Sequence, residues 1–117
     1  MKVEDVEPDS GIPELTVRVV SVAPARIIRT RSGRKTQLTE VLVGDETGTA
    51  VFTLWGFGAG SDVKAGQVLR ITDGWAKEYK GKIQLSLGRS GEFQTLEGDA
   101  GLPELSEILN NTKNNES

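Results

Sequence analysis

The chain of 117 residues contains no cysteine and no histidine. Without cysteine, disulfides, thiolate metal sites and thiol nucleophiles are excluded, and without histidine the usual zinc ligand and general base are absent. The carboxylate pair Asp45 and Glu46 lies in a predicted tight turn, with neither a third metal ligand nor a base beside it. We therefore expect a protein that is not an enzyme and that carries no metal and no cofactor.

Aromatic residues make up only 5% of the chain, so the positions of the few rings are informative. Long apolar runs are also missing. No stretch approaches the length needed to cross a membrane. The first residues, Met1 to Asp9, are acidic where a secretory signal is basic and then apolar. The length suits one domain with tails. We expect a single-domain cytoplasmic protein with no membrane partner.

Negative charge is concentrated at the two ends of the chain. The net charge is −3, yet residues 15–90 hold twelve Lys and Arg against six Asp and Glu, while residues 1–14 and 91–117 are both acidic. A basic body between acidic ends is typical of a nucleic-acid-binding protein. The alternative interpretation is that these charged residues only solvate the surface and bind no partner. Five of the cations fall within ten residues: Arg26, Arg29, Arg31, Arg34 and Lys35.

Five segments have the composition of β-strands, at residues 15–22 with a continuation at 25–29, and at 37–43, 49–55, 67–73 and 82–87. The parity of the first strand slips between Val19 and Val20, and Pro24 interrupts it, which predicts a bent strand that bulges or serves two sheets in turn. In the third strand, alternation puts Ala50, Phe52 and Leu54 in the core and Trp55 on the other face. The fifth strand directs Lys82, Gln84 and Ser86 outward.

The stretch from Trp75 to Gly81 places two aromatic rings and two lysines in what we predict to be a short connection between the last two strands. Exposed rings beside cations form a platform for single-stranded nucleic acid, because bases stack on rings while cations hold phosphates. The alternative is a hairpin loop whose rings fold back onto the core. Residue spacing does not decide whether Trp75 points into the core or toward solvent, because Gly74 could shift the strand register just before it.

Five short strands with a bent first strand predict an all-β OB-fold, a five-stranded Greek-key barrel. We expect this domain at 15–91, between a flexible acidic lead-in at 1–14 and an acidic, mostly disordered tail at 92–117. An OB-fold binds ligands on strands two and three and on two flanking loops. The candidate residues fall on these elements: Arg31, Arg34 and Lys35 in the first loop, Trp55 on the third strand, and Trp75, Tyr79 and Lys80 in the other loop.

Four segments resemble the archaeal single-stranded DNA-binding proteins with one OB-fold, of the crenarchaeal type, which are similar to the simple eukaryotic ones. They are Glu40 to Gly48, Thr53 to Gly56, Val63 to Gln67 and Gly74 to Gly81. The resemblance covers roughly residues 15–91. It implies that Trp55, Trp75 and Tyr79 stack on bases and that Arg26 and the first-loop cations lie near the DNA backbone. Ser86 stands where eukaryotic relatives carry a further aromatic residue.

The resemblance implies sequence-tolerant binding of single-stranded DNA in replication, recombination and repair, at the nucleoid. We expect the full contact set to be Trp55, Trp75, Tyr79, Arg26, Arg31, Arg34, Lys35, Lys80, Lys82 and Gln84. Two alternatives stay open, a single-stranded RNA-binding module and a protein-interaction subunit of a larger complex. We further expect a monomer in solution, with protein partners reached through the C-terminal tail, where Leu102, Leu105, Ile108 and Leu109 form an amphipathic pattern.

Overall fold

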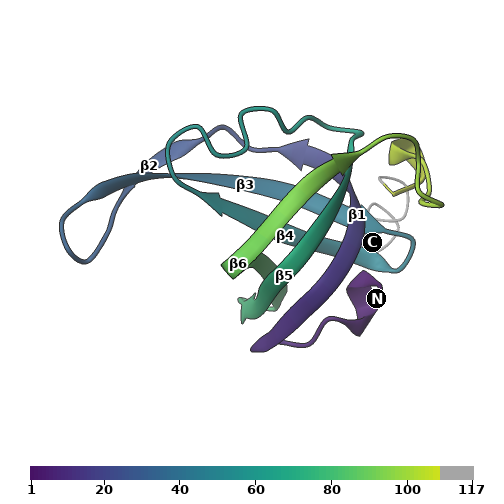
Figure 1. The fold of residues 1–117 in the computed structure, drawn as a ribbon, viewed down its shortest axis with the longest axis horizontal. Coiled ribbons are helices and arrows are strands. Elements are labelled where there is room, and N and C mark those ends of the chain that lie inside the picture. The colour runs from purple at the N-terminus through teal and green to yellow at the C-terminus, as the bar shows by residue number, and fades with distance from the viewer. Residues whose placement is uncertain (109–117) are drawn as a thin grey trace.

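The computed structural model describes residues 1–108, which form one short 3-10 helix and six strands (Figure 1). The elements are η1 (Val3–Asp5), β1 (Ser10–Val22), β2 (Arg26–Arg29), β3 (Lys35–Asp45), β4 (Gly48–Trp55), β5 (Val68–Tyr79) and β6 (Lys82–Leu96). Residues 105–108 are helical. Among these described residues, no helix is both long and apolar enough to cross a membrane.

The barrel closes because β1 pairs with two strands in turn. Up to Arg18 it pairs antiparallel with β5, and from Arg18 onward it pairs antiparallel with β3. A register shift between Val19 and Ser21 marks the change of partner, which confirms the slip in parity predicted beside Val20. The β3–β4 and β5–β6 hairpins and a parallel pairing of β4 with β6 complete the ring. This is the predicted five-stranded Greek-key barrel of an OB-fold.

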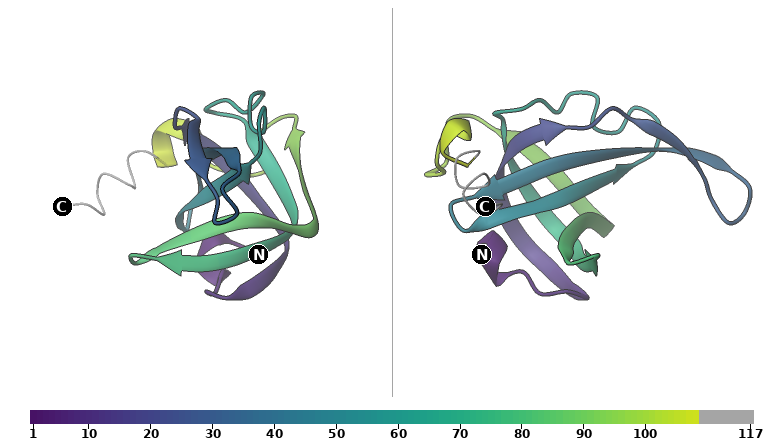
Figure 2. Two further views of the ribbon diagram at one scale, coloured as in Figure 1. Left: turned by 90° about the vertical axis from the view of Figure 1, so that its left-hand side faces the viewer. Right: turned by 180° about the vertical axis from the view of Figure 1, so that it is seen from behind.

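Pro24 separates β1 from β2, so the predicted bent first strand is two strands. β2 lies at the edge of the sheet and pairs with the beginning of β3. We call β2, the connecting loop at 30–34 and residues 35–38 of β3 the arm. The arm projects beyond the barrel in Figure 1 and in the right view of Figure 2, whereas in the left view of Figure 2 it points toward the viewer and the β5–β6 hairpin projects to the side. Two hairpins therefore extend from one barrel and leave an outer face of the sheet between them.

Alternation along β4 separates the core from this outer face. Ala50, Phe52 and Leu54 are buried, as predicted, while Trp55 is exposed. The Phe52 ring meets the Phe93 ring edge to face, with centroids 5.5 Å apart, and burial of one such side chain stabilises the fold by about 1.5–3 kcal/mol. β6 follows the predicted alternation too, with three side chains in or against the core: Ile83, Leu85 and Leu87.

The N-terminal residues pack on the barrel, which differs from the flexible lead-in predicted for residues 1–14. Val3 and Val6 are buried, and the Val3 amide donates a 2.9 Å hydrogen bond to the buried carboxylate of Asp45 in the β3–β4 turn. The Lys2 ammonium lies 2.6 Å from the Glu46 carboxylate in the same turn. The segment has few apolar residues, so composition did not reveal that these few fill one end of the barrel.

The chain also stays folded past the predicted domain end at residue 91. β6 continues to Leu96 and pairs there with the beginning of β5. Arg18 in β1 is only 6% exposed, and its guanidinium donates 2.7 Å hydrogen bonds to the carbonyls of Pro103 and Gly66 and to the Asp99 carboxylate. A buried cation therefore fastens the segment after β6 to the barrel.

Two apolar residues of the predicted tail cover the barrel instead of facing solvent. Leu102 and Ile108 are buried. Gly44 makes room for this contact, since a Cβ at Gly44 would lie 3.3 Å from Cγ2 of Ile108 and 2.9 Å from the Gly48 carbonyl oxygen. The amphipathic surface predicted for partner docking is thus partly used within the chain, and Leu109, with the rest of the predicted tail, lies outside the described residues.

Candidate nucleic-acid interface

The prediction that Trp75 to Gly81 is a connection is wrong for most of the segment. Trp75 to Tyr79 belong to β5 and pair with β6, with Trp75 opposite Ser86 and Tyr79 opposite Lys82. Only Lys80 and Gly81 form the turn, and both have positive φ, 52° and 81°, as tight hairpin turns require. The two rings are therefore held on a paired strand, where their orientation is fixed by the pleat.

The face of Trp75 is decided by an irregularity two residues earlier. The β5–β6 register shifts between Thr72 and Gly74, and Asp73 between them has a left-handed φ of 53°. After this bulge, Ala76 points into the core and is buried, whereas Trp75 points outward and is 40% exposed. Gly74 lies where the register shifts, and as a result of this shift the indole of Trp75 faces solvent.

Alternation after the bulge places Trp75, Lys77 and Tyr79 on one face of β5. Trp75 and Tyr79 are four residues apart, about 13 Å along the strand. Lys77 lies between them and is absent from the predicted contacts, because a loop, unlike a strand, has no alternation that would direct its side chain to the same face. The face therefore carries two rings with a cation between them.

A groove with a volume of about 390 Å³ runs over the outer face of the sheet, between the arm and the β5–β6 hairpin. Trp55 and Tyr79 both line it, at 56% and 58% exposure. On its floor the Thr53 hydroxyl donates a 3.1 Å hydrogen bond to the Leu85 carbonyl. The other lining residues are Arg26, Ile28, Leu38, Glu40, Lys77, Gln84 and Ser86. The groove combines two rings, an apolar wall and both donors and acceptors.

The cations in the groove and beside it differ in their availability for a ligand. Arg26 is paired with Glu40 across β2 and β3, with 2.9 Å between guanidinium nitrogen and carboxylate oxygen. Lys77 lines the groove from β5 and is exposed. Lys80 lies over the Tyr79 ring, with its ammonium 5.4 Å from the ring centroid, so it can support a base that stacks on the other side of the ring.

The first-loop cations do not line the groove. Arg31 and Arg34 are exposed in the turn at the tip of the arm, which is closed by a 2.8 Å hydrogen bond from the Thr30 amide to the Arg34 carbonyl. Lys35 is the first residue of β3 and lies opposite Arg29. Its face is opposite to that of Arg26, because the two positions differ in parity along the β2–β3 ladder.

The structure thus brings together Trp55, Tyr79, Arg26 and Gln84 of the predicted set. It places Trp75 outside the groove, beside a shallow depression lined also by Ile12, Pro13 and Gly88. Lys80 and Lys82 lie at the tip of the β5–β6 hairpin, and Arg31 and Arg34 at the tip of the arm. Sequence reasoning missed Glu40, Thr53 and Ser86 as lining residues, although strand parity puts each on the same outer face as its neighbours Trp55 or Gln84.

The closed barrel and the groove between its two projecting hairpins define an OB-fold module. Residues 6–95 match the family model described as single-stranded DNA binding protein Ssb-like, OB fold, and the chain belongs to this family. The chain is 41% identical over 111 residues to the single-stranded DNA binding protein Ssb of Saccharolobus solfataricus, covering 95% of this chain and 73% of that protein.

Two solved structures show the same fold at lower identity. The second OB-fold domain of replication protein A from Methanococcus maripaludis has a TM-score of 0.69 at 23% identity and covers 84% of this chain and 95% of its own. The Pot1 (protection of telomere) protein in its complex with single-stranded DNA has a TM-score of 0.59 at 15% identity, over 89% of this chain and 68% of its own. The expected fold and family resemblance are both confirmed.

Proposed function

We propose that this protein binds single-stranded DNA in the groove between the arm and the β5–β6 hairpin. The observation that carries the proposal is that Trp55 and Tyr79 are each more than half exposed on paired strands and line one groove. Exposed apolar side chains that gather in one groove mark a ligand-binding surface. The family and the Saccharolobus relative point to single-stranded DNA as that ligand.

Bases stack on Trp55 and Tyr79 within the groove, and a further base stacks on Trp75 beside it. Each stack contributes about 1–3 kcal/mol and is tolerant of sequence, because every base has a flat face. The binding is therefore general, which suits a protein that covers exposed strands during replication, recombination and repair. Such strands arise at the nucleoid, and we place the protein there.

Cations within the groove and on the two hairpins beside it hold the phosphates. Lys77, Lys80 and Lys82 lie on the β5–β6 hairpin, and Arg31 and Arg34 lie at the tip of the arm. If about four phosphates are neutralised, the logarithm of the affinity falls with the logarithm of salt concentration with a slope of about −3. The stacking contribution persists at high salt, so the rings determine the affinity that remains.

The test is a titration followed by intrinsic tryptophan fluorescence, using oligo-dT and oligo-rU of equal length at two salt concentrations. Only Trp55 and Trp75 report, since the chain has two tryptophans. We expect strong quenching by oligo-dT that persists at the higher salt. Equal or stronger quenching by oligo-rU would favour an RNA-binding module. No quenching of the folded protein by either would overturn the proposal and favour a protein-interaction domain.

A further inference from the structure

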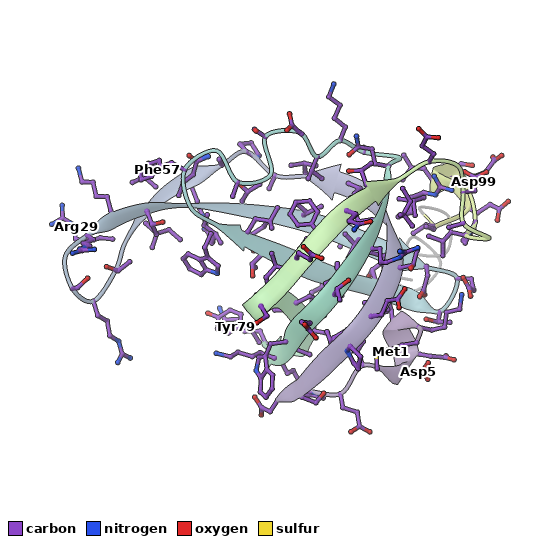
Figure 3. The ribbon with its side chains drawn as sticks, viewed as in Figure 1. Met1, Asp5, Arg29, Phe57, Tyr79 and Asp99 are labelled. Atoms are coloured by element: carbon purple, nitrogen blue, oxygen red, sulfur yellow. The ribbon has the colours of Figure 1, made fainter. Side chains whose placement is uncertain are left out.

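Two large apolar side chains on or beside the arm are exposed without a role in the groove. Ile27 on β2 is 58% exposed, and Phe57, just after β4, is 66% exposed. Neither lines the groove. In Figure 3, Phe57 and Arg29 lie along the arm, while Tyr79 lies on the β5–β6 hairpin. The arm therefore carries apolar surface apart from the proposed stacking site.

Strand alternation places this surface on the side of the arm that faces away from the groove. Arg26 and Ile28 of β2 line the groove, so Ile27 and Arg29 point the other way. Their cross-strand partners share their face, with Gln37 opposite Ile27 and Lys35 opposite Arg29. We call the surface formed by Ile27, Arg29, Lys35, Gln37 and Phe57 the back face of the arm.

Phe57 belongs to the back face because of the path of its loop. The Gly56 amide donates a 2.8 Å hydrogen bond to the Gln37 carbonyl, which starts the loop at the edge of β3. The loop then crosses the side of β3 on which Thr39 lies, since the Thr39 hydroxyl donates to the Ala59 carbonyl at 3.2 Å. Thr39 and Gln37 have the same parity, so the loop carries Phe57 over the side of Gln37.

The composition of the back face matches single-stranded nucleic acid. It presents one ring, one aliphatic side chain, one amide and the two exposed cations Arg29 and Lys35, without a carboxylate. An exposed ring beside cations stacks a base and holds its phosphates. A protein partner with an apolar surface would leave both cations without a counter-charge, so the anionic ligand is favoured.

We propose that the back face of the arm is a second contact surface for single-stranded DNA, on which a base stacks on Phe57 while Arg29 and Lys35 hold the backbone. This inference rests on the proposed function of the groove. Trp55 and Phe57 are two residues apart, at most about 7 Å along the chain, at the end of β4. A strand that leaves the groove at Trp55 passes around this end of β4 and reaches Phe57.

The test compares two oligo-dT lengths, since OB-folds occupy about 4–16 nucleotides. An oligomer of about 5 nucleotides fills the groove, and one of about 15 also reaches the back face. We expect Phe57→Ala to weaken binding of the longer oligomer at least about fivefold, the low end of one lost stack, and to leave the shorter one unchanged. Phe57→Tyr keeps the ring and is expected to bind both lengths as the parent chain does.

A second pair of variants separates stacking from charge. Phe57→Leu keeps an apolar side chain without a ring, and parent-like affinity for the longer oligomer would overturn the stacking role. The double variant Arg29→Gln, Lys35→Gln is expected to reduce the salt slope by about 1.4, and only for the longer oligomer.

The outcomes distinguish this inference from the function of the groove. If the parent chain binds both lengths and Phe57→Ala changes neither, the second surface is absent while the groove function stands. Equal weakening of both lengths would place Phe57 at the groove and also overturn the second surface. If the parent chain binds neither length, both the proposed function of the groove and the proposed second surface are overturned.

Discussion

The guanidinium of Arg26 lies 2.9 Å from the carboxylate of Glu40 inside the groove. This ion pair offsets the positive charge of Arg26 at the place where a phosphate would approach. Both side chains are partly exposed, so the pair contributes little to stability. Its main effect falls on the electrostatics of binding.

Replacing Glu40 with Gln is expected to free Arg26 for a phosphate. The slope of log affinity against log salt becomes steeper by about 0.7, the value of one more phosphate contact on a single strand, and affinity at low salt rises. Glu78→Gln is the matched control, because it removes the same charge from the other face of β5. Equal slopes for Glu40→Gln and the parent chain would show that Arg26 does not gain a phosphate.

The two rings of the groove should dominate the affinity that remains at high salt. Trp55→Ala and Tyr79→Ala are each expected to weaken binding about 5- to 150-fold, the equivalent of about 1–3 kcal/mol for one stack. Tyr79→Phe keeps the ring and is expected to stay within about twofold of the parent chain, since stacking needs no hydroxyl. Fluorescence anisotropy of labelled oligo-dT at high salt measures these ratios, and a weakened Tyr79→Phe would argue for a hydroxyl contact instead.

Trp75 lies outside the groove and is less exposed than Trp55, so its contribution is tested separately. We expect Trp75→Ala to weaken binding at high salt by at least about fivefold, the low end of one stack, with Trp75→Phe retaining most of the affinity. Less than a threefold loss would count heavily against a stacking role for Trp75.

Arg18 is expected to be a main determinant of stability. Arg18→Met removes the charged donor for Pro103, Gly66 and Asp99 and should lower the free energy of unfolding by about 2–4 kcal/mol, because two carbonyls lose their partner. Arg70→Met is the control, since its pair with Glu14 is exposed and worth under about 1 kcal/mol. Urea unfolding measures the stability of both variants, and equal midpoints for Arg18→Met and Arg70→Met would show that Arg18 has no special role in stability.

The N-terminal ion pair predicts a pH dependence. The Lys2 ammonium donates a hydrogen bond to the Glu46 carboxylate, which lowers the pKa of Glu46 below its usual 4.5 and raises the pKa of Lys2 above 10.5. A lowered carboxyl pKa adds stability above pH 4.5 that is lost as the pH falls through the lowered value. The raised ammonium pKa adds stability that is lost only at strongly alkaline pH.

Glu46→Gln should therefore lower the urea midpoint slightly at pH 7, and the difference from the parent chain should vanish in acid. Glu4→Gln is the control, because Glu4 is exposed beside the same contact and forms no described ion pair among residues 1–108. A difference that persists unchanged at acid pH would show that the charge of Glu46 is not the cause.

Features that depend on a few neighbouring residues followed from the sequence. The alternation of Ala50, Phe52 and Leu54 predicted the core face of β4 and the outward direction of Trp55, because side chains on a strand alternate whatever else the chain does. The bend beside Val20 and the break at Pro24 were visible for the same reason, since both are local disturbances of that alternation.

Features that depend on pairing between distant segments did not follow from the sequence. The face of Trp75 rests on the bulge at Asp73, which exists because β5 changes its register against β6 there. Glycines let the chains meet closely at this point, since a Cβ at Gly91 would lie 2.6 Å from the Asp73 carbonyl oxygen. Lys35 likewise lies outside the groove. It pairs with Arg29, which points to the face of β2 opposite to the groove.

Strand periodicity and composition are properties of consecutive residues, so they were enough to predict a barrel of alternating strands with a cationic first hairpin and an aromatic last one. Which rings share a groove, which cations are already paired and where the ends pack depend instead on contacts between distant segments. Arg18 contacting Asp99 and Val3 contacting Asp45 are pairs far apart in sequence, and their partners are chosen by the closed barrel.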